Sequence, residues 1–83
     1  MTDAKIQTAI AACAVGLTRH IMARDGIVQD DAYRKLCATE LFKLLSNPDT
    51  GLFLEPNESL CNLLDVELLD GVDALYAAIR PDV

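Results

Sequence analysis

Basic residues are scarce in this 83-residue chain, which carries seven Lys and Arg against 13 Asp and Glu and has a net charge of −6. Nucleic-acid-binding modules need a basic surface to neutralise phosphates, so the balance argues against that class. Tryptophan is absent and aromatic residues make up 5% of the chain, which leaves little to stack on bases or sugars. No apolar run is predicted to be long enough to span a bilayer, so we expect no membrane contact.

Cysteine and histidine are also few: the chain has Cys13, Cys37 and Cys61, and one histidine, His20. An odd number of widely spaced cysteines does not form a disulfide framework, so we expect reduced thiols and a cytoplasmic location. The spacing lacks the paired short intervals that structural zinc sites use. Cys13 lies about two helical turns before His20, too far for the hydrogen bond that an activated nucleophile needs. We therefore predict no metal, no cofactor, no catalytic residue and no enzymatic activity.

Strand signals are missing as well, because Val, Ile and Thr are sparse and never alternate over a useful length. Leu and Ala dominate, and both favour helix. We predict an all-α fold, a compact bundle of about four helices in a single domain over residues 1–83, with the first helix central. A short apolar linker over 52–54 is expected to lie over the core, and Gly71 leaves open whether 58–80 is one bent helix or two. The expected helices span about 4–24, 31–46, 58–69 and 71–80.

The first predicted helix is apolar around much of its girth, which suits a helix packed on two sides. Ala12 and Gly16 are small residues on one face, where another backbone can come close. Val15 and Met22 form an apolar stripe that three short helices are not expected to cover. Phe53 in the linker completes the candidate interaction residues. A domain of this size buries only about two-thirds of its unfolded surface, so we expect these residues to support a homodimer.

Charge divides the chain into two unlike halves. Residues 1–43 carry six Lys and Arg against five acids, whereas residues 44–83 carry Arg80 alone against eight acids. Such asymmetry is typical of a solvated surface that keeps a small protein soluble. It also suits an acidic face that docks on a protein partner with a basic surface and is steered toward it. The sequence leaves both interpretations open.

The triplet Glu58-Ser59-Leu60 resembles the Asp-Ser-Leu triplet of acyl carrier proteins. Members of that family are small, acidic and four-helical, and they attach phosphopantetheine to the serine. In that family two more helices follow the serine, whereas here only 24 residues follow Ser59, and the first residue of the triplet is Glu. An acyl-carrier-like protein is one alternative function, and a helical domain that binds a small ligand is another.

About half of the chain resembles small uncharacterised bacterial all-helical domains that combine a threonine-containing turn with a leucine-rich C-terminal half. The segments that carry the resemblance are Thr39 to Leu45, Asp49 to Glu55, Leu60 to Leu64 and Glu67-Leu68. Such domains supply no catalytic residue, and some sit beside toxin genes, so the resemblance implies a partner-binding or antitoxin-like role. We predict a small non-enzymatic interaction or regulatory module that acts as a homodimer.

Overall fold

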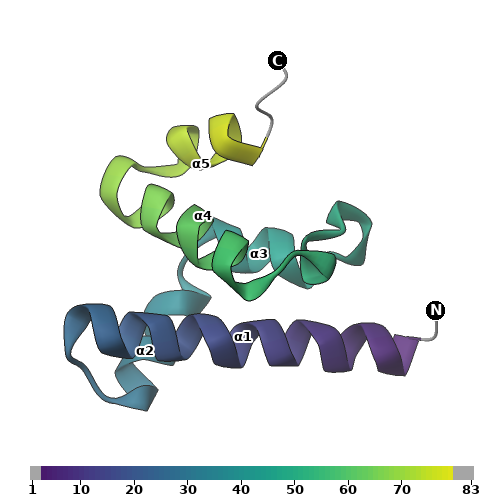
Figure 1. Ribbon diagram of the computed structural model, residues 1–83, viewed down its shortest axis with the longest axis horizontal. Helices are drawn as coiled ribbons and strands as arrows, with labels where there is room; N and C mark the ends of the chain where they lie inside the picture. Colours follow the sequence, from purple (N-terminus) through teal and green to yellow (C-terminus); the bar gives the residue numbers. More distant parts are fainter. Residues whose placement is uncertain (1–2, 80–83) are drawn as a thin grey trace.

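The computed structural model describes residues 3–79, and within them the chain is all-α, without a strand, as predicted. Residues 3–79 form five α-helices and two short 3₁₀ helices, one α-helix more than expected. Figure 1 shows α1 along one side of the molecule and α5 on the opposite side, with α3 and α4 between them. The elements are α1 (Asp3–Asp25), α2 (Gln29–Cys37), α3 (Glu40–Ser46), η1 (Pro48–Thr50), η2 (Leu52–Leu54), α4 (Asn57–Asp70) and α5 (Val72–Ile79).

The extra helix arises because the predicted helix over 31–46 is broken into α2 and α3. Thr39 stands at the break in an extended conformation, with φ −82° and ψ 151°. Its hydroxyl donates to the carbonyl of Leu36, at 2.6 Å, and accepts from the backbone N–H of Phe42, at 3.2 Å. The hydroxyl therefore satisfies one orphan group at the end of α2 and another at the start of α3, which stabilises the break.

The start of α3 is also held by a carboxylate from α4. The two oxygens of Glu67 accept the backbone N–H groups of Glu40 and Leu41, each at 2.8 Å. An anion at a helix N-terminus pairs with unsatisfied N–H groups and with the positive end of the helix dipole. The hydroxyl of Tyr76 donates to the side chain of Glu40, at 2.8 Å, and so ties α5 to the same corner.

Two glycines with positive φ angles determine where the helices end in the C-terminal half of the chain. Gly71 has φ +96°, a backbone angle that other residues rarely adopt, and it separates α4 from α5, so the described part of 58–80 forms two helices. Residue 80, the last of the predicted fourth helix, lies outside the described residues. Gly51, with φ +70°, separates η1 from η2. The predicted linker 52–54 is the 3₁₀ helix η2, in which Leu52 is buried in the core whereas Leu54 is 68% exposed.

The core is built from leucine and isoleucine side chains of every α-helix. Its fully buried large members are Leu17, Ile21, Leu36, Leu41, Leu45, Leu60, Leu64 and Leu75.

The first helix is central in its contacts, because α1 packs against α2, α3, η2 and α4. The molecule measures 36 × 32 × 19 Å, and a helix with its side chains is about 10 Å across, so the shortest dimension holds two helices. A helix in a two-layer molecule keeps one side in solvent. One long side of α1 therefore stays in contact with solvent, and Val15 on that side is 52% exposed.

The helix α1 is long and apolar enough to cross a membrane, judged by length and composition alone, which corrects the prediction that no run reaches that length. Both the core helix of a soluble protein and a signal sequence near the N-terminus meet the same criterion.

Candidate interaction groove

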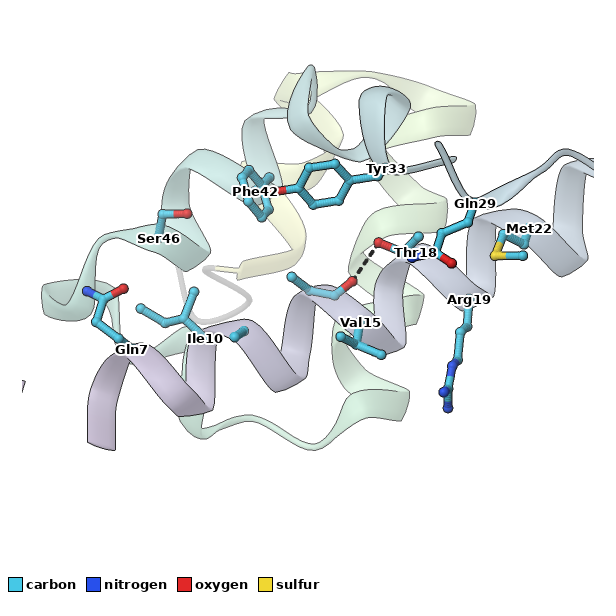
Figure 2. A pocket seen from close by; sticks show the side chains of 12 residues that line it. Gln7, Ile10, Val15, Thr18, Arg19, Met22, Gln29, Tyr33, Phe42 and Ser46 are labelled. Carbon is cyan, nitrogen blue, oxygen red and sulfur yellow. Dashed lines mark hydrogen bonds between the residues drawn. The ribbon is translucent and has the colours of Figure 1, made fainter. Parts of the chain in front are cut away.

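A groove follows the exposed side of α1. It encloses about 610 Å³, and its second wall is formed by Gln29 and Tyr33 of α2 together with Phe42 and Ser46 of α3. Figure 2 shows α1 on one side and the two aromatic rings on the other. The residues that α1 contributes are Gln7, Ile10, Ala11, Ala14, Val15, Thr18, Arg19 and Met22.

Helical spacing explains why these α1 residues share a side. Ala11, Val15, Thr18 and Met22 recur at intervals of three and four positions, so they form one stripe along the helix. Val15 is 52% exposed, although a valine is among the residues most often found inside. The hydroxyl of Thr18 donates to the carbonyl of Ala14 at 2.7 Å, so its hydrogen is satisfied within the helix (Figure 2). The stripe therefore presents a largely apolar surface.

Two aromatic rings form the opposite wall. The rings of Tyr33 and Phe42 are 6.3 Å apart between centroids and meet edge to face at 78°, a favoured geometry for an aromatic pair. Tyr33 remains 48% exposed. A hydrogen bond with Cys37, the electrostatic interaction with Cys37 and burial raise the pKa of the Tyr33 hydroxyl, which is neutral at physiological pH even without that shift. The other two residues of this wall, Gln29 and Ser46, are polar but uncharged, so the wall carries no formal charge at physiological pH.

The charge of the groove differs from that of the chain as a whole. Of the lining residues described between 3 and 79, only Arg19 carries a charge. The chain as a whole has a net charge of −6. A surface without carboxylates on an acidic protein is a place where another molecule can approach without repulsion from that surface.

The structure separates the five residues that the sequence marked as candidates for interaction. Val15 and Met22 both line the groove, and Ala12 is exposed on α1 outside its lining. Gly16 faces α4, where a Cβ atom would lie 2.1 Å from the side-chain oxygen of Asn57. Phe53 packs against the core, and its carbonyl accepts a hydrogen bond from the thiol of Cys13 at 3.7 Å.

Tyr33 and Phe42 are groove residues that sequence reasoning missed. They lie on either side of the break at Thr39, in a stretch that was expected to form one continuous helix over 31–46. No local pattern marks the two rings as neighbours, because they come together only across the break at Thr39.

A second, smaller hollow surrounds Ser59. It encloses about 450 Å³ between η2, α4 and α5, and Glu55 lies in its lining. Ser59 is the third residue of α4 and is half-buried. The serine of the acyl-carrier-like triplet therefore lies in the first turn of a helix, beside a carboxylate.

His20 meets a carboxylate across the contact of α1 with α4. Its Nε2 atom lies 2.8 Å from Oδ1 of Asp65, and Nε of Arg24 lies 3.6 Å from the same oxygen. Among residues 3–79 no three His, Cys, Asp or Glu side chains gather as a metal site would require. His20 thus helps to hold two helices together.

All three cysteines are free thiols. Burial raises the pKa of Cys13, and burial followed by the charge of Asp65 raises that of Cys61, against a hydrogen bond with Asn57 that lowers it. A raised pKa keeps a thiol protonated and unreactive at neutral pH. Cys37 is exposed on α2.

Comparison of this chain with protein-family models, with curated proteins and with solved structures gives no match.

Proposed function

We propose that this chain is a non-enzymatic protein–protein interaction module that binds another polypeptide in the groove along α1. The observation that carries the proposal is the half-exposed Val15 at the centre of an apolar, aromatic-walled groove whose one described charge is Arg19. Aromatic residues, Met and Arg are the types enriched where proteins meet. The groove contains two aromatic residues, one Met and one Arg.

The shape of the groove favours a helical segment over a small molecule. Along α1 its lining runs from Gln7 to Met22, which corresponds to about 22 Å at 1.5 Å per residue. Pockets for small molecules bury most of their ligand, whereas an open, elongated apolar groove suits the apolar face of a helix. Covering the exposed half of a side chain such as Val15 contributes about 1 kcal/mol, so several such contacts are needed for a stable complex.

The acidic half of the molecule supports a second element of the proposal, a partner that also carries a basic surface. Exposed acids on α4 and α5, among them Glu58, Asp70 and Asp73, lie outside the groove. Such a surface accelerates the encounter with a basic protein and repels acidic ones. The antitoxin-like role implied by the sequence resemblance would use the same two features.

The test is site-specific photo-crosslinking in the cells from which the protein comes. A photoreactive amino acid replaces Val15 in one variant and the exposed Glu58 of α4 in the matched control. We expect a polypeptide adduct at position 15 in much higher yield than at position 58, with the attached chain identified by mass spectrometry. Equal yields at the two positions, or only small-molecule adducts at position 15, would contradict the proposal.

A further inference from the structure

We infer that the helix α5 and the C-terminal end of α4 form a second docking surface, which binds a polypeptide segment that carries apolar side chains next to Lys or Arg. The inference rests on the proposed function and deepens it, because it assigns a place on this chain to the basic surface of the partner. We call this place the α5 surface, and its members are the exposed residues Asp70, Val72, Asp73 and Tyr76.

The helix α5 is apolar around its circumference, yet it packs extensively on one neighbour. Its sequence, VDALYAAI, contains a single charged residue, Asp73. A helix that is apolar on all sides is normally buried. Within residues 3–79, however, α5 has its extensive packing with α4 alone, and Figure 1 shows it at the edge of the molecule. Leu75 is fully buried in the core, whereas Val72 and Tyr76, four residues apart on one face, are 43% and 37% exposed.

Every charged residue of α4 and α5 is an acid. Two of these acids are engaged within the fold, since Asp65 pairs with His20 and Glu67 accepts the backbone N–H groups at the start of α3. Asp70 and Asp73 are exposed, and within residues 3–79 neither side chain makes an ion pair or a hydrogen bond. The α5 surface therefore combines exposed apolar side chains with two carboxylates whose charge is not compensated there.

Asp70 lies at a helix end that favours the opposite charge. It is the last residue of α4, and the last turn of that helix contains no basic residue. The C-terminal end of a helix carries a partial negative charge and leaves carbonyl groups without intrahelical partners, which Lys and Arg side chains can satisfy. A cation from another molecule would meet this helix end, the carboxylate of Asp70 and, three residues further on, that of Asp73. The end of α4 thus fits a Lys or Arg side chain of a partner, next to the apolar residues of α5.

The charge of the α5 surface excludes the other classes of occupant. A second copy of this chain has a net charge of −6 and is repelled, as are the phosphates of nucleic acids and of anionic lipids. Within residues 3–79 no three His, Cys, Asp or Glu side chains gather, so a metal ion lacks protein ligands. A basic polypeptide with apolar side chains complements both the acids and the apolar face.

The test measures the binding of a fluorescent peptide to the full-length protein by fluorescence anisotropy. The probe is a synthetic peptide of about 12 residues with Leu on one face of a helix and Lys on the other, and the control probe replaces each Lys with Glu. The variant Asp70→Asn/Asp73→Asn removes both carboxylates of the α5 surface. The matched control, Glu55→Gln/Glu58→Gln, also removes two exposed acids, and Glu58 lies 12 residues before Asp70, or about 18 Å along α4.

We expect the Lys probe to bind the parent chain and the Glu probe not to bind it at about 100 μM. The variant Asp70→Asn/Asp73→Asn should raise the dissociation constant of the Lys probe at least about fivefold, and its control less than about twofold. Equal values for the two variants would place the probe elsewhere on the molecule and overturn the inference. So would the absence of binding by the Lys probe at about 100 μM. Circular dichroism checks that each variant remains helical.

The apolar part of the α5 surface is tested separately. Val72→Ser should weaken binding of the Lys probe about threefold, whereas Val28→Ser, which changes a 65% exposed valine before α2, should leave it unchanged. Binding should also weaken as sodium chloride rises from about 0.05 to about 0.5 M, because salt screens opposite charges. Binding that tightens with salt, or a dimer of the parent chain that Val72→Ser abolishes, would overturn the inference.

The inference and the proposed function can fail separately, because they are read at different positions. A polypeptide photo-adduct at position 15 together with a Lys probe that ignores Asp70 and Asp73 would leave the groove standing and remove the α5 surface. A probe that depends on Asp70 and Asp73 in a chain that forms no polypeptide adduct at position 15 would remove the groove and leave the α5 surface standing.

Discussion

The side of the molecule that carries the groove and the side formed by α4 and α5 differ in how their exposed apolar residues are mixed with charged ones. The groove side exposes apolar residues beside a single described charge, Arg19. The α4–α5 side also exposes large apolar residues, Leu69, Val72 and Tyr76, but it intersperses them with acids such as Asp70 and Asp73. Carboxylates beside exposed apolar groups keep a surface hydrated and discourage association with acidic proteins. The two sides therefore differ in how many carboxylates accompany their exposed apolar residues, and the proposed function assigns partner binding to the side that has none in its described lining.

Buried and exposed sides are also found within α1 itself, and shortening one side chain on each of them to alanine gives the largest expected difference. Leu17 is fully buried, whereas Val15 two positions earlier is 52% exposed. We expect Leu17→Ala to lower the free energy of unfolding by about 2–5 kcal/mol through loss of packing and an internal cavity. Val15→Ala should change it by less than about 0.5 kcal/mol when the protein is dilute. Urea unfolding followed by circular dichroism measures both, and similar losses would refute the assignment of the two faces.

The second expected effect concerns the carboxylate that links the two sides. Glu67→Gln keeps the size of the side chain but leaves only one oxygen for the N–H groups of Glu40 and Leu41. We expect a loss of about 1–3 kcal/mol in unfolding free energy, because one half-buried donor loses its charged acceptor.

The matched control for this variant is Glu55→Gln, which changes an exposed residue after η2. It should be close to neutral in the same unfolding experiment. Equal stability of the two variants would mean that the contact of Glu67 with α3 does not contribute.

A smaller effect is expected where α1 meets α2. The carboxylate of Asp25 pairs with Lys35 and with Arg24. The hydrogen bond from Lys35, then the charges of Lys35 and Arg24, lower the pKa of Asp25 below its ordinary value of 3.8. A lowered pKa stabilises the fold above that ordinary value, and the contribution is lost as the pH falls through the folded-state pKa.

Removal of the lysine tests this pH dependence. Lys35→Met should therefore have a lower Tm than the parent chain near pH 6, and the difference should shrink on acidification below about pH 4. Lys43→Met is the control, because Lys43 is 70% exposed and lies 3.9 Å from its partner Glu40. A difference in Tm that stays constant down to low pH would contradict the role given to Asp25.

The last prediction concerns the reaction rates of the three thiols and requires no change in stability. Cys37 is exposed, whereas Cys13 and Cys61 are half-buried with raised pKa values. We expect Cys37 to react with a maleimide at neutral pH at least about tenfold faster than the other two. Mass spectrometry of the labelled peptides gives the three rates. Rapid labelling of Cys13 or Cys61 would revive a nucleophilic role for that residue.

Local sequence patterns predicted most of the fold. The helices α1, α4 and α5 were expected within one or two residues of their observed starts, because apolar periodicity and the glycine at position 71 mark them directly. The break at Thr39 was missed because Cys37, Leu41 and Leu44 recur at intervals of four and three positions, a spacing that also fits one continuous helix. Only the pairing of Glu67 with α3, from 26 residues further along the chain, makes the new helix start visible.

The candidate site was less predictable than the fold. Val15 and Met22 could be chosen because their spacing on α1 is a local property. Tyr33 and Phe42 could not, since their place in the wall depends on the angle that the break at Thr39 creates between α2 and α3. Gly16 was interpreted as a contact point for another chain, whereas its small size accommodates Asn57 of the same chain.

The hydrogen bonds from the start of α3 to Glu67 of α4 also affect the shape of the groove. Phe42, a wall of the groove, lies one residue after Leu41, whose N–H is held by Glu67. A substitution at Glu67 would thus tilt or loosen that wall while touching nothing in the groove itself. In a screen that measures partner binding for every substitution in the chain, changes at position 67 should reduce binding as changes at a contact residue do. A binding site mapped from such a screen alone would therefore include residues that the partner does not touch.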